Sequence, residues 1–391
     1  MRRTLITLCT ALTLTLAGVG AAAPAQGASR GPAPGTPAPV AGGLSFPLSV
    51  AADTARPGSV LVTQDAGVTP DFISSLNRVT RQGTVATVHR GAAGAEVGGV
   101  SSRWGLTFFA ETTGAGSGDP AAPSGLIKVV LPGGSVRTLA DVATHEETTN
   151  PDGRVQYGFA GLPAGCAEQL PAEVGPATYT GQVDSHAYAT ELGFGEVYVA
   201  DAGGNDVVAV NPLRGTVRTV AVLPAQSVAV TADVAAGLGL PACAVGSTYR
   251  FESVPTDVRV GPDHWLYVSV LPGGPEGPQL GARGAVYRIN PWAGRWQRPQ
   301  LVATGLVSPT GLAFGPRGDL YVAELFADRV SVLRAGALRG RTPATPVPVL
   351  TVNNPADVSI SGRTLYVTAN AVPDETTPPN TGQVLSVALR G

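Results

Sequence analysis

Charged side chains are scarce in this chain, since only 14% of its 391 residues are Asp, Glu, Lys or Arg. The 26 basic and 28 acidic residues leave a net charge of −2. The basic surface that nucleic-acid binding requires is therefore missing. With 43% hydrophobic residues, the chain is too apolar for intrinsic disorder and long enough to bury a large core.

Standard catalytic motifs are also missing. The sequence contains no Gly-x-Ser-x-Gly elbow, no His-Glu-x-x-His helix and no Cys-x-x-Cys pair. These absences exclude the common serine-hydrolase and zinc sites.

Glycine and proline, in contrast, are abundant, with 51 and 34 residues spread along the chain. Glycine supplies positive φ angles, and proline fixes φ while removing a hydrogen-bond donor, so this content indicates many turns. Long helices are not expected. The composition favours an all-β fold of short strands.

The N-terminus has the pattern of a Sec signal peptide. Arg2 and Arg3 precede an apolar stretch, and Ala23 and Ala25 offer the small residues of a cleavage site. We expect residues 1–25 to be removed on export, residues 26–39 to form a disordered Pro/Gly/Ala leader, and residues 40–391 to form one secreted domain. No later segment approaches the length of about 20 apolar residues that a membrane-spanning helix needs.

Two cysteines, Cys166 and Cys243, remain after the signal peptide is removed. An even count in an oxidising compartment predicts a disulfide between them. The alternatives are two free thiols or a metal pair, but neither residue has His or Cys neighbours at ligand spacing.

A repeat of about fifty residues organises the domain. Each copy has two short strands of alternating apolar residues joined by a Gly-containing turn, and one or two further strands follow. The clearest copies open with residues 255–268, 309–322 and 355–367, and the recognisable strands of three weaker copies start near residues 60, 106 and 196. Six four-stranded units predict a six-bladed β-propeller.

The last copy ends after three strands, so its fourth strand must come from elsewhere. Residues 40–47 match the linker 302–309 between two other copies. We therefore predict that the N-terminal segment pairs with residues 383–388 and closes the ring, which removes an exposed sheet edge.

Long insertions fall between second and third strands, at 111–124, 271–284 and 369–382, and between copies, at 142–182 and 223–254. In a propeller all of these project from one face. Loops of this length without obvious regular structure are typical of functional or disordered segments. The predicted disulfide joins the two longest.

Several polar residues of these loops are candidates for chemistry. His145, Glu146 and Glu147 precede Asn150 and Asp152, and such groups near the channel mouth suit a metal ion or acid–base work, although solvated loop groups or turn caps are the simpler interpretation. The ligand-binding candidates are Asp184, His186, Asp201, Asn205, Asp257, Arg283, Glu324 and Asp357. Asp184, His186, Asp257 and Asp357 are also candidate ligands for Ca²⁺ or another divalent metal, but the equivalent repeat positions of Asp257 and Asp357 favour a structural role in bonding backbone N–H groups.

Residues 255–284, with Ala200–Asn205 and Asn150–Gly153, resemble the ScyD/ScyE family of secreted bacterial proteins. The resemblance extends from about Pro39 to Arg390. It implies a six-bladed TolB-like or NHL-like propeller, and it implies little about chemistry. Asp184-Ser-His186-Ala departs from the family's Asp-Ser-Asn-Pro at that position.

The sequence therefore predicts an exported monomer that binds a small molecule or a protein partner on its loop-rich face, in connection with secondary metabolism or the cell envelope. The alternative is an enzyme with a metal–carboxylate site at the channel mouth, with a lactonase-like or oxidative tailoring activity. Fold alone does not choose between them.

Overall fold

The computed structural model describes residues 34–65, 73–115, 123–276, 280–340, 342–372 and 380–389. The predicted signal peptide lies outside these residues, as do the central parts of three predicted loops. No described helix has the length and apolar character needed to cross a bilayer.

Seven four-stranded antiparallel sheets make up the described part of the chain. Five of them use strands that are consecutive in sequence, as the hairpin pattern of the repeats predicts. Sheet 1 consists of β2 (Val50–Ala52), β3 (Val60–Gln64), β4 (Ser75–Val79) and β5 (Val85–Arg90). Sheet 2 consists of β6 (Glu96–Arg103), β7 (Leu106–Thr113), β8 (Ser124–Val130) and β9 (Val136–Asp141). Sheet 3 consists of β12 (Ala187–Gly193), β13 (Glu196–Asp201), β14 (Asp206–Val210) and β15 (Val217–Val222). Sheet 4 consists of β18 (Ser253–Val260), β19 (Leu266–Pro272), β20 (Gly284–Ile289) and β21 (Gln300–Leu306). Sheet 5 consists of β22 (Pro309–Phe314), β23 (Leu320–Glu324), β24 (Arg329–Leu333) and β25 (Val347–Thr351).

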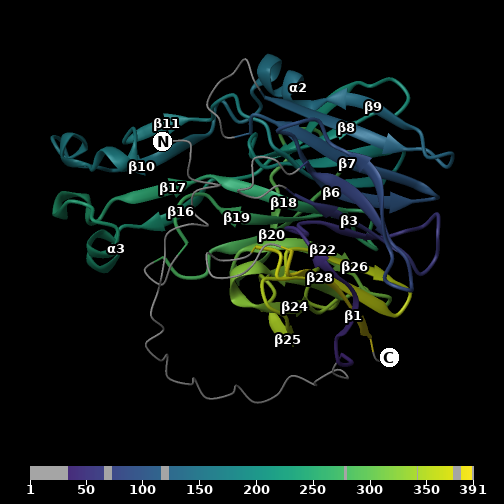
Figure 1. Ribbon diagram of the computed structural model, residues 1–391. Coiled ribbons are helices and arrows are strands. Elements are labelled where there is room, and N and C mark those ends of the chain that lie inside the picture. The colour runs from purple at the N-terminus through teal and green to yellow at the C-terminus, as the bar shows by residue number, and fades with distance from the viewer. Residues whose placement is uncertain are drawn as a thin grey trace.

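Sheet 6 joins the two ends of the described chain. It consists of β26 (Val358–Ser361), β27 (Thr364–Ala369), β28 (Gly382–Ala388) and, at its edge, β1 (Ala38–Leu44). Strand β1 is antiparallel to β28, with Ala41 opposite Val384 and Leu44 opposite Gly382; in Figure 1 these strands lie side by side in purple and yellow. The predicted pairing of the N-terminal segment is confirmed, and the strand begins at Ala38, inside the expected leader.

The first strands of the six sheets contact one another in cyclic order: β2, β6, β12, β18, β22, β26 and again β2. A separate apolar cluster fills the space between each sheet and the next. Because each sheet is packed on both faces, second strands such as β13 and β23 are buried almost throughout, and the apolar runs in the repeats follow from this packing.

The seventh sheet was not predicted. It has the order β11 (Thr178–Thr180), β10 (Gln156–Ala160), β17 (Thr248–Phe251) and β16 (Gln226–Ala229), and it comes entirely from the insertions 142–182 and 223–254. We call it the insertion sheet; it projects from the other sheets at the left of Figure 1. The expectation that these insertions lack regular structure is wrong, because short strands far apart in the chain pair only through tertiary contacts.

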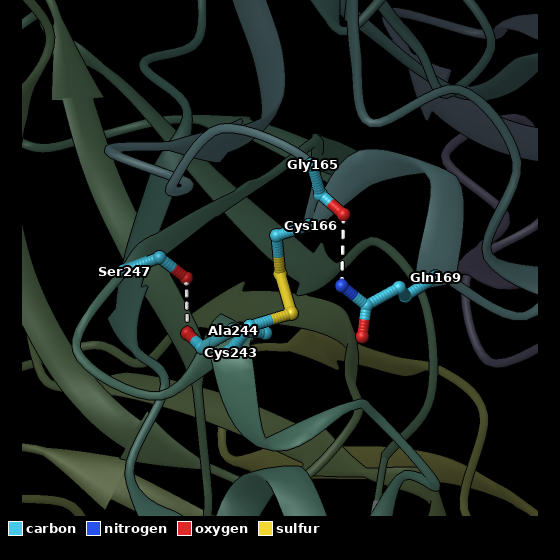
Figure 2. The surroundings of a disulfide bond; sticks show 6 residues. All are labelled: Gly165, Cys166, Gln169, Cys243, Ala244 and Ser247. Atoms are coloured by element: carbon cyan, nitrogen blue, oxygen red, sulfur yellow. Dashed lines mark hydrogen bonds between the residues drawn. A yellow bond between two sulfur atoms is a disulfide. The ribbon is translucent and has the colours of Figure 1, made fainter.

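The disulfide between Cys166 and Cys243 is present, with the two Cα atoms 5.8 Å apart (Figure 2). Cys166 is 1% exposed. The pair belongs to a small apolar cluster with Phe159 of β10 and Val234 of α3 (Ala232–Gly237). The insertion sheet therefore has a core and a covalent cross-link of its own.

Candidate metal centre

Two segments meet at the loop end of sheet 3. One is helix α2 (Val142–Thr149) with the turn that follows it, and the other is the connection between β13 and β14. The side chain of Asp141 caps α2 by accepting from Ala143 N, and the helix ends at Asn150, which has a left-handed φ of 36°. This start and stop fix the positions of the polar groups described below.

Asp206 is the central residue of the site. It lies at the start of β14, opposite Asp201 at the end of β13. Its exposed fraction is 0%, and neither of its carboxylate oxygens has a hydrogen-bond partner. An unpartnered buried carboxylate is costly, and every such group calls for a physical explanation.

Asp201 differs from Asp206 because its oxygens are fully used. It accepts hydrogen bonds from Ser185 Oγ at 2.6 Å, from the backbone N of His186 at 2.7 Å and from the backbone N of Gly204 at 3.2 Å. None of these donors carries a full charge. Asp201 therefore organises the loops and adds a negative charge beside Asp206.

The equivalent position of sheet 5 gives an internal comparison. There Glu324 ends the second strand, and the residue opposite it on the third strand is Arg329. The Arg329 guanidinium donates to both Glu324 oxygens at 2.8 Å. In sheet 3 a second carboxylate occupies the position that holds a cation in sheet 5.

Further oxygens surround Asp206. Asp152 is 0% exposed, and one of its oxygens accepts from Tyr157 Oη at 3.0 Å and from Asn205 Nδ2 at 2.9 Å. The remaining unpartnered oxygens in the cluster are Glu146 Oε1, Asp152 Oδ1 and Asn205 Oδ1.

Gly204 shows how closely the acids approach one another. A Cβ atom built on Gly204 would lie 3.1 Å from Glu146 Oε2 and 3.4 Å from Asp206 Oδ1. Carboxylate oxygens of α2 and of β14 therefore converge on the same glycine. A side chain at this position would enter the space that these oxygens share.

The charges of this cluster repel one another. Burial and the neighbouring Asp201, Asp152 and Asp184 raise the pKa of Glu146 to about 9. Burial raises the pKa of Asp152 to about 6. Burial, with Asp201, Glu146 and Asp152, also raises the pKa of Asp206 well above its ordinary range. A bound cation would reverse these shifts, because it favours the charged form of each acid.

The donor atoms indicate which cations suit the site. In the described part of the chain, no three His, Cys, Asp or Glu side chains are grouped so that they could hold a metal ion, so an ion at this place would also need amide or backbone oxygens as ligands. The nearby histidines are engaged, His145 with Thr219 Oγ1 at 2.9 Å and His186 with Glu96 Oε2 at 3.1 Å. A mixed set of carboxylate and amide oxygens suits Ca²⁺ and does not suit Zn²⁺.

Four of the predicted residues lie at this cluster. Asn205 and Asp201 belong to it directly, while the backbone N–H of Asp184 bonds to Glu146. His186 faces Glu96; burial opposes its protonation, but the Glu96 carboxylate outweighs this effect and raises the pKa of His186 to about 9. A protonated His186 is a poor metal ligand.

Asp257 and Asp357 lie elsewhere, between the first strands at the centre of the molecule. Asp257 accepts from the backbone N of Leu312 at 2.7 Å, and Asp357 accepts from the backbone N of Val50 at 2.8 Å. Each thus bonds to the next sheet, as the structural interpretation of their equivalent positions predicted. Their oxygens are occupied, which weighs against metal binding by this pair.

Arg259 completes this central network. Its guanidinium lies 3.2 Å from Asp257, 3.8 Å from Asp357 and 3.5 Å from Glu191. The cavity beside it has a volume of about 10 Å³, room for about one water molecule. The space beside Arg259, between the first strands, is therefore small.

The remaining two candidates are separate from both groups. Glu324 is the partner of Arg329 in sheet 5. Arg283 stacks on Phe251 of the insertion sheet, 4.1 Å from the ring centre, and donates to the backbone O of Pro275 at 2.7 Å. Burial lowers the pKa of Arg283 to about 10.

The residues predicted from the sequence include Asp201 and Asn205 but not Asp206, and the simpler interpretation placed Glu146 and Asp152 in solvated loops. Glu146 is 2% exposed. A comparison of the repeats could have pointed to Asp206. Asp201 and Asp206 have the same five-residue spacing as Glu324 and Arg329, but only the second pair contains a cation.

No family model matches the sequence, and no curated protein matches it. The chain is similar to the PQQ-bound aldose sugar dehydrogenase of Streptomyces coelicolor, with a TM-score of 0.53 and 14% identity over 91% of this chain and 99% of that chain. The chain has a β-propeller fold. It is also similar to the soluble aldose sugar dehydrogenase of Escherichia coli, with a TM-score of 0.52 and 12% identity over 91% of this chain and 99% of that chain. A gluconolactonase of Xanthomonas campestris is similar with a TM-score of 0.50 and 12% identity over 95% of this chain and 99% of that chain. At these identities the similarity establishes the fold alone.

Proposed function

We propose that this protein is an exported, six-bladed β-propeller of the ScyD/ScyE type that binds a divalent cation of the Ca²⁺ class beside Asp206. The ion holds the loop-rich face in the shape that receives a small molecule or a protein partner. The cyclic contacts of the first strands and the pairing of β1 with β28 support six blades closed by the N-terminal strand.

One observation carries the cation assignment. Asp206 is buried, both of its oxygens lack partners, and it faces Asp201 where the same register position of sheet 5 provides Arg329. A positive charge would stabilise this pair in its ionised form. A metal ion supplies it without a cationic side chain.

The ion would join two parts of the chain. Glu146 comes from the first insertion, whereas Asn205 and Asp206 come from the connection between β13 and β14 and from the start of β14. Cation binding is therefore coupled to the docking of the insertion against the propeller, because the ligands come together only in the folded chain.

The burial of the cluster favours a structural ion over a catalytic one. Asp152 and Asp206 are both 0% exposed. A catalytic metal keeps an open position that substrate reaches. The ion is consequently assigned to shaping the loop-rich face rather than to chemistry on a substrate.

Calorimetry of the mature chain tests this function. After chelation, Ca²⁺ at about 100 times its dissociation constant should stabilise the fold by about 2.7 kcal/mol, which corresponds to a rise in Tm of about 4 °C for a domain of roughly 350 residues. Mg²⁺ at the same concentration should give a smaller rise, because it demands regular octahedral geometry. An unchanged Tm with every divalent cation would refute the proposal.

A further inference from the structure

Three hairpins at the opposite end of the strands from the metal centre have bulky side chains in an unusual backbone conformation. These hairpins join the first and second strands of sheets 2, 3 and 4. At their tips, Trp104, Phe194 and His264 have φ angles of 53°, 52° and 67°. Left-handed backbone is disfavoured for large side chains.

The first two hairpins have two-residue loops, Trp104-Gly105 and Phe194-Gly195. Both residues of each loop have positive φ, which is the type I′ turn. Asn-Gly is the sequence that this turn prefers, so an aromatic residue at the first position lowers the stability of the hairpin.

The third hairpin can be compared with the equivalent hairpin of sheet 5. The loop 261–265 has the same length as the loop 315–319, and the left-handed position that His264 occupies there is Gly318 in sheet 5. Glycine adopts this conformation without strain. The fold therefore does not require a histidine at the tip.

These side chains are also exposed, and Phe194 and His264 form an aromatic cluster with Trp292. Trp104 is 71% exposed and Phe194 is 40% exposed. The Phe194 ring lies 5.8 Å from the ring of His264 and 4.7 Å from that of Trp292, which is 62% exposed. Exposed aromatic residues that cluster in this way mark a binding surface.

A cavity of about 380 Å³ lies beside the cluster, and Arg103, Phe194 and His264 are among the residues that line it. This volume falls within the range of small-molecule sites. Arg103 stacks on Trp104 at 4.7 Å and donates to the backbone O of Leu192 at 3.0 Å, so it joins the tips of sheets 2 and 3. The lining contains no carboxylate.

We propose that these turns form a saccharide-binding site, independent of the cation site. A pyranose ring has an apolar C–H face that stacks on Phe194 or a tryptophan, and a rim of hydroxyl groups that accept hydrogen bonds from Arg103 and His264. Flat rings exposed on separate hairpins suit successive units of an oligosaccharide. Such binding would account for the left-handed backbone of these bulky residues at the tips.

Titration of the mature, Ca²⁺-saturated protein with soluble tetrasaccharides of glucose, N-acetylglucosamine and galacturonic acid tests the proposal, with tryptophan fluorescence and calorimetry as readouts. Benzoate serves as the non-saccharide aromatic probe. We expect at least one tetrasaccharide to bind and Phe194→Asn to weaken it about tenfold. The same substitution should preserve or raise Tm, because it creates an Asn-Gly turn.

Leu213→Asn is the matched control, since Leu213 is 93% exposed and lies outside the aromatic cluster; it should leave binding unchanged. Asp206→Asn should also leave saccharide binding unchanged, so that failure of the cation site and failure of this site are distinguishable. Binding of benzoate alone, no binding of any tetrasaccharide at millimolar concentration, or equal binding by Phe194→Asn would each overturn the inference.

Discussion

Asp201 and Asp206 face each other across β13 and β14, and both are buried. The corresponding pair in sheet 5, Glu324 and Arg329, is an ion pair. The residue opposite the acid that ends the second strand is thus an arginine in sheet 5 and a second acid in sheet 3.

Replacing Asp206 by Asn should have different effects on the ion-free and the Ca²⁺-bound protein. The substitution keeps the shape and removes a carboxyl group whose ionisation is opposed by burial and by Asp201, Glu146 and Asp152. In chelator we expect a Tm equal to or above that of the parent protein, and in Ca²⁺ we expect no rise. Differential scanning calorimetry in both buffers measures this.

Asp319→Asn is the matched control for that substitution. Asp319 is also largely buried, but it accepts from Arg334 and from the backbone N of Ala335 at 2.9 Å. Its loss should lower Tm in both buffers and leave the Ca²⁺ response intact. A Ca²⁺ response that disappears in both variants would contradict the assignment to Asp206.

The stability of the ion-free protein should fall as pH rises. Glu146 has a folded-state pKa of about 9, raised by burial and by Asp201 and Asp152, whereas in the unfolded chain it ionises near its ordinary value of about 4.3. Folding therefore opposes its ionisation, and stability is lost progressively from about pH 4 to pH 9. Urea unfolding across this range checks the slope, which saturating Ca²⁺ should flatten.

Removing the disulfide should affect the insertion sheet more than the propeller. The Cys166→Ser, Cys243→Ser double variant should lose about 2–5 kcal/mol of stability in the region that the bond closes. Because this sheet has its own apolar cluster, the amides of β10 and β17 should lose protection from hydrogen exchange, and those of β19 and β23 should keep it. Equal loss in all four strands would show that the sheets unfold as one unit.

Arg259→Met should destabilise the centre of the propeller. It leaves Asp257, Asp357 and Glu191 without their shared cation, and breaking such a buried network costs about 3–5 kcal/mol. Arg334→Met removes a more exposed partner of Asp319 and should cost about 1 kcal/mol or less. Chemical denaturation of the two variants compares them directly.

The repeats predicted the strands of the propeller closely because each hairpin is local. Strand β22 begins at Pro309, the first residue of the copy predicted at 309–322, and β3 begins at Val60, where a weaker copy was expected. The insertion sheet could not be predicted from the sequence, because β10 and β17 are short and pair across a long stretch of chain. Only part of the candidate site could be predicted from the polar loop residues. The sequence shows that Glu146 and Asp152 are acidic, but it does not show that folding buries them.

The most direct test of the central claim is isothermal titration of Ca²⁺ into the chelated mature protein and into Asp206→Asn. The account predicts one site per chain in the first and no binding in the second. Absence of binding in the mature protein, or the same stoichiometry and affinity in both, would contradict it.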